Sequence, residues 1–306
     1  MISLKSASLQ VLVDPDYGAD ITSISCRRTG EEVLFQAPWR DHAQRAIDNP
    51  SERIFSDSEL SWLERYRGGW QILCPTAGKR DSTPEGSLFH GEASRRSWTI
   101  NSENSEQVEL GLRLETATLD IARSVRVEGS TVTVTDELVN TGDSLVRFDL
   151  SQHVALGGDL LDGECSIGVD AQSFFEDQAM TEPSQGNVKS EWLASGLDLV
   201  PAKPSSRFAL GWLSDFTETA ARFRNESRDI TVTLRWSPVL PYAWLWQELD
   251  YSPNWPWLSR TRVLGFEPSS TPTSGPERNS SAQLAPGESL TVDTSLTVAG
   301  PAELSL

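Results

Sequence analysis

Hydrophobic and polar positions alternate with a period of two along several separate stretches of this chain. Between residues 107 and 115, apolar side chains occupy every second position and mostly charged residues lie between them. The other stretches with the same alternation are 121–127, 132–134, 230–236 and 290–298. Such alternation turns one face of a strand toward a core and the other toward water, so it predicts antiparallel β-structure.

Helical patterns are scarce in the sequence. Residues 56–66 predict one or two helical turns, with Ser56 or Asp57 as the N-cap. Polar segments at 128–130 and 140–143 predict turns, and the Pro- and Ser-rich segment 268–285 predicts a surface loop. With no repeat or linker visible, we expect residues 1–306 to form a single all-β domain, a large twisted antiparallel two-sheet sandwich with little helix.

The charge of the chain limits its partners. Its 44 acidic and 26 basic residues give a net charge of −18, which repels nucleic acids and anionic membranes. No segment is apolar enough to span a bilayer, and the first ten residues lack the apolar core of a signal peptide. The three cysteines are far apart and are expected to be reduced thiols. These features predict a cytoplasmic protein.

Tryptophan is concentrated in segment 241–273, at positions 244, 246, 255 and 257. An apolar run, 263–266, then leads to Glu267, which Pro268 biases toward an extended conformation. Aromatic faces pack on the C–H face of a sugar, and a partly desolvated carboxylate can move a proton near neutral pH. The segment is therefore consistent with a sugar-binding pocket, and equally with a tryptophan-rich core strand that runs into a loop.

Only three histidines occur in the chain. His42 lies in a polar stretch and is expected at the surface. His90 precedes a glycine, which permits close approach of a ligand, and His153 lies in or at the end of an apolar strand. Both are compatible with a structural or a site role. Arg67 precedes two glycines, where its guanidinium could donate two parallel hydrogen bonds in a cleft or lie in a surface turn.

The order of these motifs is specific. Arg67-Gly68-Gly69-Trp70 is followed by His90-Gly91, then by His153, then by Gly265-Phe266-Glu267-Pro268. This order resembles the aldose 1-epimerase (galactose mutarotase-like) superfamily, including its glucose-6-phosphate epimerase-like branch. Segments 17–24, 30–35 and 284–289 also resemble the opening hairpins and the C-terminal turn of that family. The resemblance therefore covers essentially the whole chain.

The resemblance implies a β-supersandwich enzyme that interconverts the α and β anomers of a free sugar without a metal or cofactor. It implies that His153 donates a proton to the ring oxygen, that Glu267 takes the proton of the C1 hydroxyl, and that His90 binds near the ring oxygen. Arg67 matches the substrate-binding arginine of the family. Further candidates for sugar contacts are Trp246, Gln247, Glu248 and Asp250.

The chemistry of these groups fits that reaction. Opening a cyclic hemiacetal requires a base at the anomeric hydroxyl and an acid at the ring oxygen, and the two exchange roles when the ring closes again. A histidine titrates near neutral pH by itself, and a glutamate does so when desolvated. No nucleophile is required.

The chain also departs from the family pattern. It carries His-Gly-Glu-Ala-Ser at 90–94 where relatives carry His-Gly-Gly or His-Gly-Phe-Ala-Arg. The missing arginine argues against a sugar phosphate, so we expect the substrate to be a monosaccharide without a phosphate group. We expect the protein to be a monomer or a homodimer.

Two other functions remain open from sequence. One is a glycoside hydrolase or lyase that uses Glu248 with Glu267, because hydrolysis needs two carboxylates. The other is a non-catalytic carbohydrate-binding or sensor protein. The scattered histidines have no recognisable metal-ligand spacing.

Overall fold

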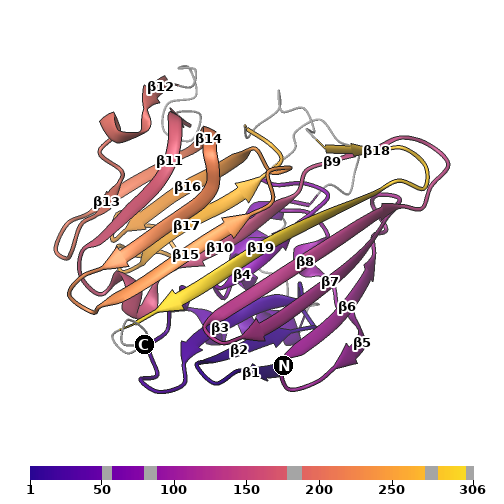
Figure 1. Cartoon of the computed structure of the whole chain (residues 1–306), viewed down its shortest axis with the longest axis horizontal. Helices are drawn as coiled ribbons and strands as arrows, with labels where there is room; N and C mark the ends of the chain where they lie inside the picture. The colour runs from indigo at the N-terminus through magenta and orange to yellow at the C-terminus, as the bar shows by residue number, and fades with distance from the viewer. Residues whose placement is uncertain (50–56, 79–87, 178–187, 273–281, 301–306) are drawn as a thin grey trace.

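The structure is a computed structural model. It describes residues 1–49, 57–78, 88–177, 188–272 and 282–300. Seventeen strands are hydrogen-bonded into one network, which folds into two facing layers around an apolar core (Figure 1). The predicted all-β supersandwich is confirmed. None of the helices within the described ranges is long and apolar enough to cross a membrane.

The first layer contains the strands whose alternation is clearest in the sequence. In order of pairing they are β5 (Thr99–Glu103), β6 (Gln107–Arg113), β7 (Leu119–Glu128), β8 (Thr131–Asn140), β19 (Ser289–Ala299) and β15 (Ile230–Trp236). Along β7 the residues facing the core are fully or almost fully buried, and most of their neighbours are at least partly exposed. This layer is amphipathic because only one of its faces is covered.

The second layer is buried more deeply. In order of pairing it contains β1 (Ile2–Lys5), β2 (Leu9–Asp14), β3 (Asp20–Cys26), β4 (Trp70–Leu73), β10 (Ser151–Leu156), β17 (Arg262–Ser269) and β16 (Tyr242–Leu249). All residues of β4 and β10 are buried. Such strands carry no alternating polar face, so periodicity alone identifies them poorly.

A long strand joins the two layers. β14 (Arg207–Asn225) pairs with β16 along its first half and with β15 along its second half. β11 (Cys165–Glu176) pairs with β14. It also pairs with two short strands, β12 (Val188–Glu191) and β13 (Leu199–Val200). A separate two-stranded sheet consists of β9 (Val146–Phe148) and β18 (Ala282–Leu284). Most of the predicted 268–285 loop lies between β17 and β18, and residues 273–281 of it lie outside the described residues.

Two helices lie against the outer face of the second layer. α2 (Ser58–Arg65) begins at Asp57, whose carboxylate accepts hydrogen bonds from the Glu59 and Leu60 amides, as predicted for an N-cap. α1 (Arg40–Asp48) was not predicted, because its sequence is mostly polar and only Ala43 and Ala46 are buried. The short 3₁₀ helices are η1 (Ala93–Arg95), η2 (Gly158–Leu161) and η4 (Trp192–Ala194).

The helices cover a second, smaller apolar cluster. Its members are Phe35, Ala37, Trp39, Ala43, Trp62, Tyr66, Ala155 and Val263. Ala155 and Val263 come from the sheet, on the face opposite to the main core, and most of the rest come from the helices and the segments next to them. The second layer is therefore covered on both faces.

Candidate functional site

One row of side chains crosses the outer face of the second layer. Residues directly opposite each other in an antiparallel pair share a face. Gln71 on β4 lies opposite His153 on β10, and Trp244 on β16 lies opposite Glu267 on β17. The register of β10 with β17 also places His153 opposite Glu267. Four strands thus bring Gln71, His153, Glu267 and Trp244 into line.

His153 and Glu267 lie next to each other. His153 Nε2 lies 3.5 Å from Glu267 Oε1, and the two side chains are only 4% and 10% exposed. Burial raises the pKa of Glu267 to about 8 and lowers the pKa of His153 to about 4, because each group loses the water that stabilises its charged form. At neutral pH the pair therefore holds one proton, and it offers one donor and one acceptor.

His90 lies beside this pair. Its ring centroid is 5.5 Å from that of His153, and its Nδ1 accepts a hydrogen bond from the Gly78 amide at 2.9 Å. The backbone of His90 is left-handed, with φ of 61°, and Gly91 follows with φ of 74°. A Cβ on Gly91 would lie 2.3 Å from the Cys74 carbonyl oxygen, so this position requires glycine.

Aromatic rings surround the two histidines. The Trp62 ring lies edge-on to both, with centroids 4.5 Å from His90 and 5.7 Å from His153. Tyr66 is 5.7 Å from His153 and stacks on Trp62, and Trp246 lies 6.3 Å from His153 on the sheet side. Burial, with the nearby Glu267 charge as a smaller cause, raises the pKa of Tyr66 well above its ordinary value. The rings exclude water from the pair and keep the polarity around it low.

A sugar needs more room than these exposed fractions provide. The most accessible member of the pair, Glu267, is 10% exposed at its side chain. A ligand could reach the pair only if the residues that cover it moved.

Arg67 is held by acids rather than facing open space. Its guanidinium lies 2.5 Å from Asp14 Oδ2 and 3.5 Å from Asp20 Oδ2, and it also donates to Gln44 Oε1 at 2.9 Å. Burial lowers the pKa of Arg67, but the charges of Asp20 and Asp14 outweigh this effect and raise it. Desolvation raises the pKa of Asp20 to about 7. Arg67 adjoins the row through Asp20, whose Oδ2 also accepts a hydrogen bond from Gln71.

Three other predicted sugar contacts lie away from the pair. Gln247 follows Trp246 on the strand and so lies on the opposite face, where it donates to the Leu197 carbonyl. The Glu248 carboxylate accepts hydrogen bonds from the Tyr251 and Ser252 amides and the Ser252 hydroxyl, and it closes the turn after β16. Asp250 pairs with Arg262 at 3.2 Å. Of the four candidates on this strand and the turn after it, Trp246 lies nearest the histidines.

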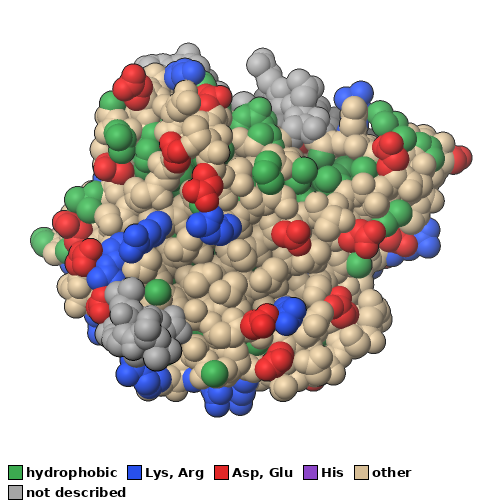
Figure 2. Space-filling view, viewed as in Figure 1, with side chains coloured by type: hydrophobic (Ala, Val, Ile, Leu, Met, Phe, Trp, Pro, Cys, Tyr) green, Lys and Arg blue, Asp and Glu red, His purple; other side chains and the backbone are tan. Residues whose placement is uncertain are grey.

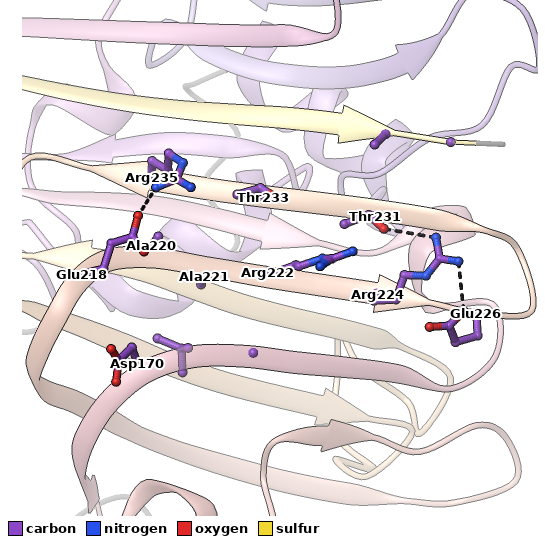
Figure 3. Close-up of a pocket in the computed structure, with 14 residues that line it drawn as sticks. Asp170, Glu218, Ala220, Ala221, Arg222, Arg224, Glu226, Thr231, Thr233 and Arg235 are labelled. Atoms are coloured by element: carbon purple, nitrogen blue, oxygen red, sulfur yellow. Dashed lines mark hydrogen bonds and ion pairs between the residues drawn. The ribbon is translucent and has the colours of Figure 1, made fainter. Parts of the chain in front are cut away.

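The outer surface of the β11–β14–β15 region contains a hollow of about 620 Å³, which is separate from the His153 cluster (Figure 3). Arg235 pairs with Glu218, and Arg224 pairs with Glu226, along its length. Figure 2 shows acidic and basic side chains interspersed on the face around it. These pairs neutralise one another, and they give the hollow no proton-transfer group with an unusual environment.

The chain is similar to a known protein family over nearly all of its length. The family model described as "Domain of unknown function (DUF4432)" matches residues 1–298. The chain belongs to the DUF4432 family. No curated protein matches it.

Two solved structures similar to this DUF4432 protein share its architecture over nearly their whole length. A galactose mutarotase related enzyme from Lactobacillus acidophilus has a TM-score of 0.70 and 13% identity, covering 98% of this chain and 97% of its own. A galactose mutarotase-like protein from Clostridium acetobutylicum has a TM-score of 0.71 and 14% identity, covering 97% and 94%. At these identities the similarity establishes the fold. The predicted resemblance to the galactose mutarotase-like superfamily is confirmed at that level.

Several residues around the His153–Glu267 pair were not predicted from the sequence. Trp62 and Tyr66 were available as an i, i+4 aromatic pair in the predicted helical segment. Gln71 was visible as a polar residue within the apolar run 70–75. Asp20 carried no signal of its own, because only the pairing of β3 with β4 brings it next to Gln71.

Proposed function

We propose that this DUF4432 protein is an aldose 1-epimerase, which interconverts the anomers of a free monosaccharide by acid–base ring opening. The observation that carries the proposal is the His153–Glu267 pair, 3.5 Å apart and enclosed by aromatic rings. Mutarotation moves one proton from the anomeric hydroxyl to the ring oxygen. A pair that holds one proton between two groups can supply both ends of that transfer.

The environment of the pair decides which group holds the proton before the sugar binds. In the free protein at neutral pH the proton lies on Glu267, whose pKa is about 8, and His153 is neutral, with a pKa of about 4. For Glu267 to act as the base and His153 as the acid, the proton first moves between them across the 3.5 Å gap. Ring closure to the other anomer reverses every proton transfer, so each group serves as acid in one direction and as base in the other.

His90 supports the sugar rather than the proton transfer in this proposal. Its Nδ1 accepts the Gly78 amide proton, so its Nε2 is the ring nitrogen directed to other contacts. With its ring 5.5 Å from His153, it lies within reach of a sugar that contacts the pair. Trp246 would supply an aromatic face for the C–H surface of the ring.

The proposed substrate lacks a phosphate group. Arg67, which adjoins the row through Asp20, is already paired with Asp14 and Asp20. Glu92, which stands where relatives have a different residue after His-Gly, accepts hydrogen bonds from the Glu115 and Thr116 amides and pairs with Arg96 at 3.0 Å. A phosphate dianion would meet acids instead of unpaired cations.

Hydrolysis is less well supported. It requires two carboxylates that flank the scissile bond. Glu248 is engaged by three hydrogen bonds that close a turn, and Asp250 is paired with Arg262. A purely carbohydrate-binding function would leave the proton-sharing pair without a role.

The test is the rate of anomer exchange of wild-type protein and Glu267→Gln over a panel of monosaccharides, measured by polarimetry and NMR saturation transfer. We expect wild type to accelerate exchange of at least one sugar, and the variant to lose roughly 10²–10⁴-fold while still binding it. Glu218→Gln, on the outer surface, is the matched control and should behave as wild type. Sugar binding by wild type without any acceleration would favour the binding protein.

A further inference from the structure

Gln71 is a neighbour of the His153–Glu267 pair for which no role was predicted from the sequence. It lies opposite His153 in the β4–β10 pairing, and it is 1% exposed. Because opposite residues share a face, its side chain lies on the same side of the sheet as His153 and Glu267.

The orientation of the Gln71 amide is fixed by a carboxylate. Gln71 Nε2 donates to Asp20 Oδ2 at 2.8 Å, and the Arg67 guanidinium lies 3.5 Å from the same oxygen. A guanidinium can only donate, so Oδ2 is a hydrogen-bond acceptor. Asp20 is in turn held by Arg67, which is anchored by Asp14. This chain of charges keeps the NH₂ group toward Asp20, so the carbonyl oxygen Oε1 is the end of the amide left for another contact.

That oxygen is buried without a hydrogen-bond partner among the described residues, and so is His153 Nδ1. An unpaired buried polar atom costs roughly 1–3 kcal/mol, and a ligand group that donates to it would recover that cost. Gln247 Oε1 is unpaired as well, but it lies on the other face of the second layer. The Tyr66 hydroxyl is also unpaired among the described residues, and its ring lies 5.7 Å from His153. Gln71 Oε1 belongs to the residue directly opposite His153 in the β4–β10 pairing.

We propose that Gln71 recognises the substrate, with Oε1 accepting a hydrogen bond from one hydroxyl of the sugar bound at the His153–Glu267 pair. This inference rests on the function proposed above. Asp14, Arg67 and Asp20 position the amide and do not themselves touch the sugar. A buried acceptor of this kind makes the site selective, because an analogue lacking the hydroxyl leaves the oxygen unpaired.

The experiment compares a sugar with its own deoxy analogues. Exchange rates are measured for the best substrate of the panel and for each single-deoxy form, with wild type, Gln71→Met and Gln107→Met. Methionine keeps the length and apolar volume of the side chain and removes the acceptor. Gln107, half-buried on the distant strand β6, is the control. Thermal unfolding verifies that each variant is folded, and Gln71→Leu replaces Gln71→Met if the latter does not fold.

In wild type we expect one deoxy analogue to lose about 10-fold or more in kcat/KM, the effect of one buried hydrogen bond. In Gln71→Met the kcat/KM for the parent sugar should fall to the wild-type value for that analogue. The kcat/KM for the analogue itself should be the same in the variant as in wild type. A ratio of parent to analogue that is the same in Gln71→Met as in wild type overturns the role of Gln71.

The outcome for Gln71 is separable from that for the enzyme function. If wild type binds a sugar without accelerating its exchange, the enzyme proposal fails, and the same ratio measured as binding affinity by ligand-observed NMR still decides the role of Gln71. If no sugar of the panel binds to wild type, both proposals are overturned.

Discussion

His153 and Glu267 lie opposite each other on adjacent strands, with Nε2 and Oε1 3.5 Å apart. Among the described residues no cation pairs with Glu267, and both side chains are nearly excluded from water. Their pKa values are therefore displaced in opposite directions, each toward the neutral form.

Anomer exchange should depend on pH in a bell-shaped manner. Above about pH 8 Glu267 loses its proton while His153 is neutral, so the pair has no acid; below about pH 4 both are protonated, so the pair has no base. We expect kcat/KM to fall on both sides of this window, because it reports the free protein. The measurement is exchange rate from pH 3.5 to 9.5 by NMR, corrected for the spontaneous reaction. A profile that stays flat across pH 8 would contradict the assignment.

Replacement of Glu267 by glutamine should stabilise the protein at alkaline pH. The folded-state pKa of about 8 lies above the ordinary value of 4.5, so this carboxyl stabilises the fold at low pH relative to high pH and loses that contribution as pH rises through 8. Between pH 6.5 and 8 the unfolding free energy of wild type should fall relative to Glu267→Gln by about 2 kcal/mol, at about 1.4 kcal/mol for each pH unit. His153 is neutral throughout this interval.

Urea unfolding at four pH values measures this effect. Glu218→Gln serves as the control, since Glu218 is largely exposed. Parallel pH curves for wild type and Glu267→Gln would show that Glu267 is not desolvated as described.

Removal of Arg123 alone should destabilise the main core strongly. Arg123 and Asp136 are both fully buried, with 3.0 Å between Nη1 and Oδ2, and Asp136 also accepts from Gln152. Arg123→Ala leaves a buried carboxylate without its cation, which costs about 3–5 kcal/mol. Arg123→Met combined with Asp136→Leu should recover most of the loss, because it removes both charges.

The control for this pair is Arg113→Ala. Arg113 is exposed, 3.6 Å from Asp120, and its loss should change stability by less than about 1 kcal/mol. Equal effects of Arg113→Ala and Arg123→Ala on the urea midpoint would be incompatible with a buried ion pair.

The glycine after His90 should be irreplaceable. Gly91→Ala places a Cβ 2.3 Å from the Cys74 carbonyl, whereas Gly129→Ala, also at positive φ, meets nothing within 4 Å. The left-handed backbone destabilises both variants. The clash destabilises only Gly91→Ala, by a further amount of about 1–3 kcal/mol. Differential scanning calorimetry of the two variants measures the difference. A Gly91→Ala melting temperature at or above that of Gly129→Ala would show that the backbone there relaxes freely.

The strands of the first layer could be predicted from the sequence because their signal is local. Stretches such as 107–115 and 230–236 alternate with the period of a half-buried strand, and the structure contains β6 and β15 there. The cap at Asp57 was equally local. The fully buried strand β10 and the polar helix α1 carry weaker patterns, so their extent was not predicted.

The chemical types at the candidate site were also available from the sequence, whereas their arrangement was not. His90, His153 and Glu267 could be named from motif order, yet nothing local shows that Arg67 is neutralised by Asp14 and Asp20, or that Glu248 closes a turn. Alignment of Gln71 with His153 and Glu267 depends on the register of three strands far apart in the chain. A slip of one residue in any of them would turn its side chain to the other face, and only the packing of the complete sandwich fixes that choice.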